Sequence, residues 1–365
     1  MLKKRSSNYE LMRIISMFLI VLYHTIYHGF AIDLAVNQYT KIILELLRLV
    51  TIVHVNSFIL MTGFFQSQSK FRLSKVLDLV LLSTFYKLVI IIIFDYCNLV
   101  DFSFLQLIKE LFPLELVHNW YFRYYIVLYF LSPFINTGLN LLNKKSFKNL
   151  ILVLVFFFSV IPMLTNGVGF PNDGYTLYQF IFMYLIGAYF RKFPLEIKCN
   201  KFIYRILLII IFCLCVFLNY LLFRYSLLHL GESTLIGELS SYYQLYYLYY
   251  SNIIIVVQSL SYFLFFGTFN FNNNLINHVS KMMFGIYLLH DNNYIRANIY
   301  TWMNINNDLI YSFRYFMYVI WLALIIFVIS YIIESVRYYV CYVLKKVFKF
   351  NKLERKLDNF QLVDK

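Results

Sequence analysis

An apolar stretch near the N-terminus contains four side chains that can take part in chemistry: Glu10, Arg13, His24 and His28. Imidazole accepts or donates a proton near neutral pH, and guanidinium binds phosphate or carboxylate through several donors. In a helix the eleven-residue spacing puts Arg13 and His24 within ~20° of one face, separated by a rise of ~16 Å. This stripe predicts either a packing network, with Arg13 paired to Glu10, or a reaction path.

The element that positions these groups is expected to cross a membrane. Of the 365 residues, 61% are hydrophobic and only 14% are charged, which excludes an ordinary soluble domain. Only 11 Gly and 5 Pro are present, so a collagen-like or disordered chain is excluded as well. The net charge of +14 could suit nucleic acid, but a basic apolar chain more often keeps Lys and Arg in cytoplasmic loops.

The sequence predicts an all-α, polytopic integral membrane helical bundle of about ten transmembrane helices, because a span needs ~20 mostly apolar residues. The expected spans are 10–32, 41–65, 74–96, 120–142, 149–166, 174–191, 202–224, 245–268, 280–301 and 313–340. Residues 1–345 are expected to form one transmembrane module, and 346–365 a short basic cytoplasmic tail.

The distribution of charge predicts that both termini are cytoplasmic. Positive residues precede the first span and fill the even-numbered connections and the tail, at Lys3, Lys4, Arg5, Lys70, Arg72, Lys75, Lys144, Lys145, Lys148, Arg191, Lys192, Lys345 and Lys346 among others. The odd-numbered connections hold mainly acidic residues, such as Asp33, Asp101 and Glu232. This is the positive-inside pattern, and it accounts for the net charge without a nucleic-acid partner.

Three further features of the sequence are an amphipathic segment, a Tyr-rich stretch and the five cysteines. Residues 102–116 predict an amphipathic interfacial piece. The Tyr-rich stretch 225–250 is either an aromatic belt or a sugar-stacking surface. The five cysteines are scattered, and the C-x-C spacing of Cys213 and Cys215 suits neither a zinc site nor a disulfide framework. We therefore expect no metal and no permanently bound cofactor.

Five blocks of the sequence resemble the acyltransferase-3 family, integral membrane enzymes that acylate bacterial surface glycans. The first is 9–16, followed by His24 at the family's distance from Arg13; the others are 55–65, 118–134, 184–189 and 284–292. In the second block Thr62 stands where Ser is more frequent. Residues 133–136 and the pair His290 and Asp291 look closest to the capsular and exopolysaccharide branch.

The resemblance implies a multi-pass O-acyltransferase of the bacterial cytoplasmic membrane. It would transfer acetyl from cytoplasmic acetyl-CoA to a hydroxyl of a surface polysaccharide or its lipid-linked precursor. The expected partners are the bilayer, the acyl-CoA, the glycan acceptor and polysaccharide-assembly proteins; the sequence makes no prediction of oligomeric state. A flippase, transporter or polymerase for lipid-linked saccharides is the alternative, although the Arg13 and His24 stripe has no evident purpose in a carrier.

On this reading His24 is catalytic, as the base for the acceptor hydroxyl or as a transient acyl carrier. The donor phosphates are expected to bind at Arg13, which is also assigned as catalytic, and at Lys70, Arg72 and Lys75. The alternative for the three loop residues is that their charges only orient the chain in the membrane. The acceptor mouth is predicted from residues at the outer ends of spans four and nine: Trp120, Arg123, His290, Asp291, Asn292 and Arg296. Interface anchoring is the alternative for Trp120 and His290.

Overall fold

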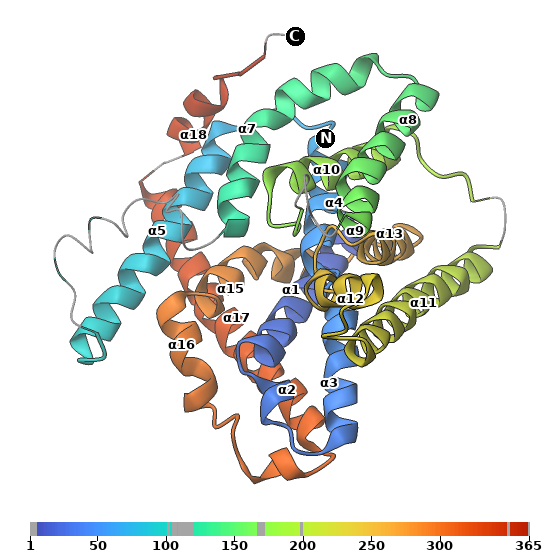
Figure 1. Ribbon diagram of the computed structural model, residues 1–365. Helices are drawn as coiled ribbons and strands as arrows, with labels where there is room; N and C mark the ends of the chain where they lie inside the picture. The colour runs from blue at the N-terminus through green and yellow to red at the C-terminus, as the bar shows by residue number, and fades with distance from the viewer. Residues whose placement is uncertain are drawn as a thin grey trace. The chain divides into compact units, whose positions relative to one another are not determined.

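The computed structural model describes residues 6–100, 103, 108, 120–165, 172–197, 200–348 and 351–363, and within them it is helical, with no strand (Figure 1). The all-α prediction is confirmed. Lys3, Lys4, Arg5 and nearly all of the predicted interfacial piece 102–116 lie outside the described residues.

In chain order the helices are α1 (Ser7–Tyr27), α2 (Ala31–Leu34), α3 (Gln38–Thr51), α4 (His54–Gln66), α5 (Leu73–Tyr96), α7 (Trp120–Leu141), α8 (Lys144–Val155), α9 (Ile161–Leu164), α10 (Leu177–Lys192), α11 (Lys201–Leu228), α12 (Leu235–Tyr246), α13 (Ile253–Gly267), α14 (Asn274–Val279), α15 (Met283–His290), α16 (Asn293–Trp302), α17 (Tyr315–Val347) and α18 (Asn351–Asp358). A π-helical turn (Phe156–Val160) joins α8 to α9, and short 3₁₀ turns are Ser280–Met282 and Asp308–Tyr311.

Six helical stretches of the described chain are long and apolar enough to cross a bilayer: α1, α3 with α4, α5, α8 through α9, α11 and α17. They support a polytopic membrane protein. The other expected spans are also helical, but α10 has 16 residues and α13 has 15, against the ~20 that a full crossing needs. The count of ten and the cytoplasmic position of both termini stay predictions.

The expected span 280–301 is broken in the middle. α15 ends at His290, and α16 begins at Asn293 after a cap in which the Asn292 side chain accepts a hydrogen bond from the Tyr294 amide at 3.1 Å. Asn is a favoured N-cap because its oxygen satisfies an otherwise orphaned amide. In membrane proteins such breaks occur where the backbone is buried in protein or lines a cavity, and this one puts Asp291 at the turn.

The chain divides into two compact units. The first consists of Met1–Ile20, Glu45–Ser69 and Phe134–Ile276, and the second of Val21–Leu44, Lys70–Pro133 and Asn277–Lys365. Each unit therefore draws on segments that are far apart in sequence, and α1 supplies residues to both.

In the first unit α4 and α10 pack backbone to backbone. A Cβ on Gly63 would collide with the Tyr184 carbonyl, and one on Gly187 would collide with the Leu60 carbonyl. Small residues permit such close approach between helices in a membrane, where van der Waals packing replaces the hydrophobic effect. Both glycines belong to sequence blocks on which the family resemblance rests, so these blocks have a packing function.

In the second unit a buried carboxylate joins α5 and α17. Glu334 is 1% exposed; it accepts a hydrogen bond from the Tyr86 hydroxyl at 2.5 Å and pairs with Arg337 at 2.6 Å. A Cβ on Gly285 of α15 would collide with this carboxyl group. Gly285 thus lets α15 pack directly on the ion pair.

Part of the basic tail packs on the start of α5 in the same unit. The Ser74 amide donates to the Asp358 carboxylate at 3.0 Å, and Lys345 pairs with Asp78 at 2.5 Å and with Glu354 at 2.9 Å. Leu362 packs against the apolar cluster around Phe71 and Tyr129. These contacts hold α18 beside the Lys70–Lys75 region.

We expect Gly285→Ala to destabilise the protein by about 1–3 kcal/mol, the usual cost of forcing an extra methyl into a packed interior. The methyl would displace the Glu334 carboxylate from Tyr86 and Arg337. The midpoint of thermal unfolding in detergent measures the effect. Gly138→Ala is the matched control, because no described atom lies within 4 Å of the point where its methyl group would stand; equal losses in the two variants would contradict the packing argument.

Candidate functional site

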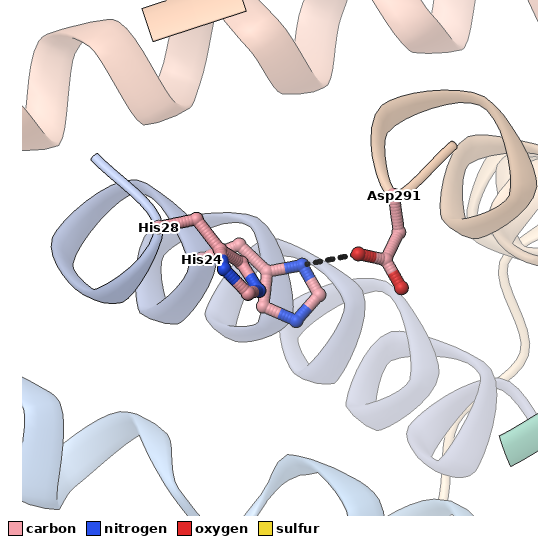
Figure 2. Close-up of side chains that lie close together, drawn as sticks. All are labelled: His24, His28 and Asp291. Atoms are coloured by element: carbon pink, nitrogen blue, oxygen red, sulfur yellow. Dashed lines mark ion pairs between the residues drawn. The ribbon is translucent and has the colours of Figure 1, made fainter. Parts of the chain in front are cut away.

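The C-terminal turn of α1 and the break between α15 and α16 bring three sequence-predicted residues together in the second unit. His24 Nδ1 lies 3.1 Å from His290 Nε2 and 3.5 Å from Asp291 Oδ1. Figure 2 shows the Asp291 carboxylate pointing toward the His24 ring from the opposite segment. His290 is 2% exposed, Asp291 8% and the His24 side chain 14%, so the cluster is largely shielded from solvent.

The hydrogen bonds of His290 determine which nitrogen of His24 can act as a base. His290 Nδ1 lies 2.7 Å from the Ile286 carbonyl oxygen, and only a protonated nitrogen can donate to a carbonyl. In neutral His290, Nε2 then carries the lone pair, which accepts the proton on His24 Nδ1. This assignment, inferred from the partners, leaves the lone pair of His24 on Nε2. The pair therefore orients His24 as a proton acceptor.

A cation compensates the charge of the buried Asp291. Arg296 Nη1 donates to Asp291 Oδ1 at 2.9 Å, and its Nη2 donates to Asn293 Oδ1 at 3.0 Å. A buried carboxylate without such a partner would be strongly destabilising. Asp291 thus stands between a permanent cation and an imidazole, where its charge favours an imidazolium formed on His24.

His28 also belongs to this site, although the sequence reasoning assigned it no role beyond its place among the polar residues of the first span. Its ring lies edge-on to that of His24, with the centroids 4.9 Å apart. His24, His28 and Asp291 each offer a ligand atom, and these atoms lie within 4.8 Å of one another. The i,i+4 spacing of the two histidines indicates that they share one side of the helix. It does not indicate the third member of the group, because Asp291 is distant in the sequence.

A cavity of about 810 Å³ opens beside the cluster in the same unit. Its lining includes His28 and Arg296, the tyrosines Tyr294 and Tyr300, and the asparagines Asn293 and Asn306. Ligand pockets commonly have about 300–1,000 Å³, so this cavity has room for a sugar. Aromatic faces with a few converging polar groups suit a sugar ring, which is apolar on its faces and polar at its rim.

The remaining residues of the predicted acceptor mouth have other contacts. Asn292 caps α16, as described above. The Trp120 ring lies edge-on to Tyr121, whose ring contacts Tyr287, and Arg123 lies 5.0 Å over the Tyr124 ring. Tyr287 in turn contacts His290, so a series of aromatic rings runs from the start of α7 to the histidine pair.

The predicted donor residues fall into two groups. In the first unit, Arg13 pairs with Glu10 at 2.5 Å, the contact expected from the packing alternative. In the second unit, Lys70, Arg72 and Lys75 surround the start of α5. Lys70 and Arg72 are exposed, and the Lys75 ammonium lies 4.7 Å over the Tyr129 ring.

The acyltransferase domain model of the acyltransferase-3 family matches residues 7–335. Neither a curated protein nor a solved structure gives a significant match. The matched range includes His24, His28, His290, Asp291 and Arg296, and covers most of the chain.

We expect Arg296→Met to destabilise the protein by about 1–3 kcal/mol, below the 3–5 kcal/mol of a fully buried pair, because Arg296 is about one-third exposed and solvent screens it. The double variant Arg296→Met with Asp291→Asn should regain much of this loss, since the uncompensated charge is gone. Thermal unfolding measures both. Arg355→Met, at an exposed arginine, should have no effect; a double variant less stable than Arg296→Met would refute the charge argument.

Proposed function

The chain belongs to the acyltransferase-3 family, and we propose that it is a membrane O-acyltransferase in which His24 is the catalytic base. The proposed donor is cytoplasmic acetyl-CoA, and the proposed acceptor is a hydroxyl of a bacterial surface polysaccharide or its lipid-linked precursor, as in the capsular and exopolysaccharide branch. The observation that carries the base assignment is the contact of His24 with His290 and Asp291. The family favours this function over a flippase, transporter or polymerase.

The proposed reaction needs one proton acceptor and one electrophile. The acceptor hydroxyl attacks the thioester carbonyl carbon while its proton moves to His24 Nε2. The new C–O bond forms, the C–S bond breaks, and the proton passes to the departing thiolate, which yields the ester and free CoA thiol. Asp291 stabilises the transient imidazolium, as the carboxylate of a catalytic triad does. The same contact would also stabilise the cation of an acylated His24, and we propose the base because direct attack by the hydroxyl needs no covalent intermediate on the imidazole.

The acceptor sugar is proposed to bind in the cavity beside the cluster. Tyr294, Tyr300, Arg296 and Asn293 line this cavity; the two tyrosines are proposed to contact the sugar ring, and Arg296 and Asn293 to donate hydrogen bonds to its hydroxyls. In this arrangement His290 and Asp291 are positioning residues for His24 rather than direct sugar ligands. Trp120 and Arg123 are proposed to guide the glycan toward the cavity.

The donor is proposed to bind through its phosphates at Arg13, Lys70, Arg72 and Lys75. This requires these residues to face the cytoplasm, with about ten spans and both termini inside, in the bacterial cytoplasmic membrane. The bilayer and polysaccharide-assembly proteins complete the proposed partners. The cationic loop before α5 offers exposed Lys70 and Arg72 for such an anion.

We expect His24→Gln to lower acetyl transfer at least 100-fold, in the range that a general base contributes, without changing the thermal unfolding midpoint by more than a few degrees. His290→Gln should lower kcat and leave both KM values unchanged, because it misorients the base only. Transfer is measured with purified protein as O-acetyl formed from acetyl-CoA on isolated polysaccharide. His278→Gln is the control, since His278 contacts Tyr339 at another place in the second unit. Full activity in His24→Gln would refute the base assignment.

We expect Arg13→Lys to weaken acetyl-CoA binding and Arg13→Ala to weaken it further, because lysine keeps the charge but loses the planar fork. Trp120→Ala should weaken use of the glycan without changing acetyl-CoA binding. Calorimetric titration with acetyl-CoA distinguishes the two effects. A topology reporter fused after Lys75 should show that this loop lies on the cytoplasmic side of the membrane. If Arg13→Ala binds acetyl-CoA as tightly as the wild type, Arg13 serves only as the partner of Glu10.

A further inference from the structure

We propose that His24, His28 and Asp291 form a binding site for Zn²⁺, and that the bound ion blocks acyl transfer by occupying the catalytic imidazole. The binding part stands on the geometry of the three side chains. The inhibitory part rests on the proposed function of His24 as the base.

The three side chains approach the geometry of a zinc site. Their ligand atoms lie within 4.8 Å of one another. Zinc binds imidazole nitrogen at ~2.0–2.1 Å and carboxylate oxygen at ~2.0–2.2 Å in tetrahedral sites, which places neighbouring ligand atoms about 3.4 Å apart. His24 Nδ1 and Asp291 Oδ1 are already 3.5 Å apart. The separations that involve His28 are at most 4.8 Å, so closing the site requires its ring to move toward the other two ligands.

His28 is placed to make that movement. It follows the last residue of α1, and its amide bonds to the His24 carbonyl at 2.8 Å, so its backbone is anchored one turn beyond His24. Its side chain lines the cavity, where the ring has room to rotate. As Figure 2 shows, both histidines extend from the same helix end, while Asp291 approaches from a different segment.

The chemistry of the donor set selects the ion. Two imidazoles and one carboxylate are a ligand set of zinc sites that keep a fourth position open. Ca²⁺ and Mg²⁺ prefer sets made of oxygen ligands. The Arg296 hydrogen bond to Asp291 has the character of the outer contacts that orient ligating carboxylates. The sequence indicated no metal because the third ligand comes from a segment more than 260 residues away.

Binding of the ion at either nitrogen of His24 removes the base. An ion on Nε2 occupies the lone pair that would accept the hydroxyl proton. An ion on Nδ1 takes the place of the proton that Nδ1 carries in the free site. The neutral ring then carries its proton on Nε2, which can no longer accept one. Since His28 and Arg296 line the proposed acceptor cavity, the ion also lies at the acceptor's approach. Inhibition is therefore expected to compete with the glycan and not with acetyl-CoA.

The binding test uses the purified full-length protein in metal-free detergent buffer, titrated calorimetrically with chelator-buffered Zn²⁺. We expect one ion per chain in the wild type, and at least a tenfold weaker affinity in His28→Gln and in Asp291→Asn. His28→Cys should retain binding, because thiolate is also a zinc ligand. Co²⁺ should give the visible absorption of a tetrahedral ion in the wild type and lose it in His28→Gln.

His278→Gln is the matched control and should bind Zn²⁺ as the wild type does. The site would be overturned if Zn²⁺ bound with equal affinity to the wild type, His28→Gln and Asp291→Asn. It would also be overturned if Zn²⁺ bound to none of them. The unfolding midpoints of His28→Gln and His28→Cys should agree. Loss of zinc binding in His28→Gln then reflects the missing ligand and not misfolding.

The activity test separates this inference from the proposed function. Zn²⁺ should inhibit O-acetyl transfer in the wild type at the concentrations at which it binds, and glycan should relieve the inhibition. An active enzyme that binds zinc without inhibition would overturn the inhibitory role. A protein with no transfer activity but with His28-dependent zinc binding would refute the proposed function and leave the metal site supported.

Discussion

Asp291 is a nearly buried carboxylate in a largely apolar chain, and the arrangement of the candidate site depends on how its charge is compensated. Arg296 meets it at 2.9 Å, and His24 lies 3.5 Å from the same oxygen. The carboxylate can occupy this position because the helix breaks after His290 and Asn292 caps the next one. A continuous helix through 280–301 would place residues 291 and 296 on faces about 140° apart and could not pair them in this way.

Three glutamates with little exposed surface are compensated more locally. Glu10 with Arg13, Glu45 with Arg48, and Glu334 with Arg337 are i,i+3 pairs within α1, α3 and α17. Each pair neutralises a glutamate on its own helix face, so no distant element is needed. Asp291 and Arg296 instead pair across a helix break. Their geometry leaves the carboxylate facing the His24 imidazole of α1, a group that can gain or lose a proton near neutral pH, and this makes the pair suited to a function beyond neutralisation.

The sequence was sufficient for the helical class, for a membrane location and for the family, because apolar segment length and motif spacing are local properties. It also selected His24 and, independently of it, the pair His290 and Asp291. It placed the latter two at a sugar-binding mouth and did not predict their contact with His24, since that contact depends on how α1 packs against the turn after α15. The break within 280–301 was missed because hydropathy alone does not distinguish a continuous helix from two short ones joined by an Asn cap. His28 was not selected because it lies ~60° away from the face of Arg13.

The three i,i+3 pairs differ in how much of the arginine side chain is exposed. The Arg13 side chain is 31% exposed, against 14% for Arg48 and 15% for Arg337 in the other two i,i+3 pairs. A pair whose cation is partly exposed is easier to separate than one whose two members are both buried, so exchanging the Glu10 carboxylate for a phosphate is expected to cost less at Arg13 than at the other two arginines. The same exchange at Glu334 would strand a buried carboxylate at a cost of about 3–5 kcal/mol. Among these three arginines, Arg13 is therefore the one that can release its partner for a ligand, and Arg48 and Arg337 are structural.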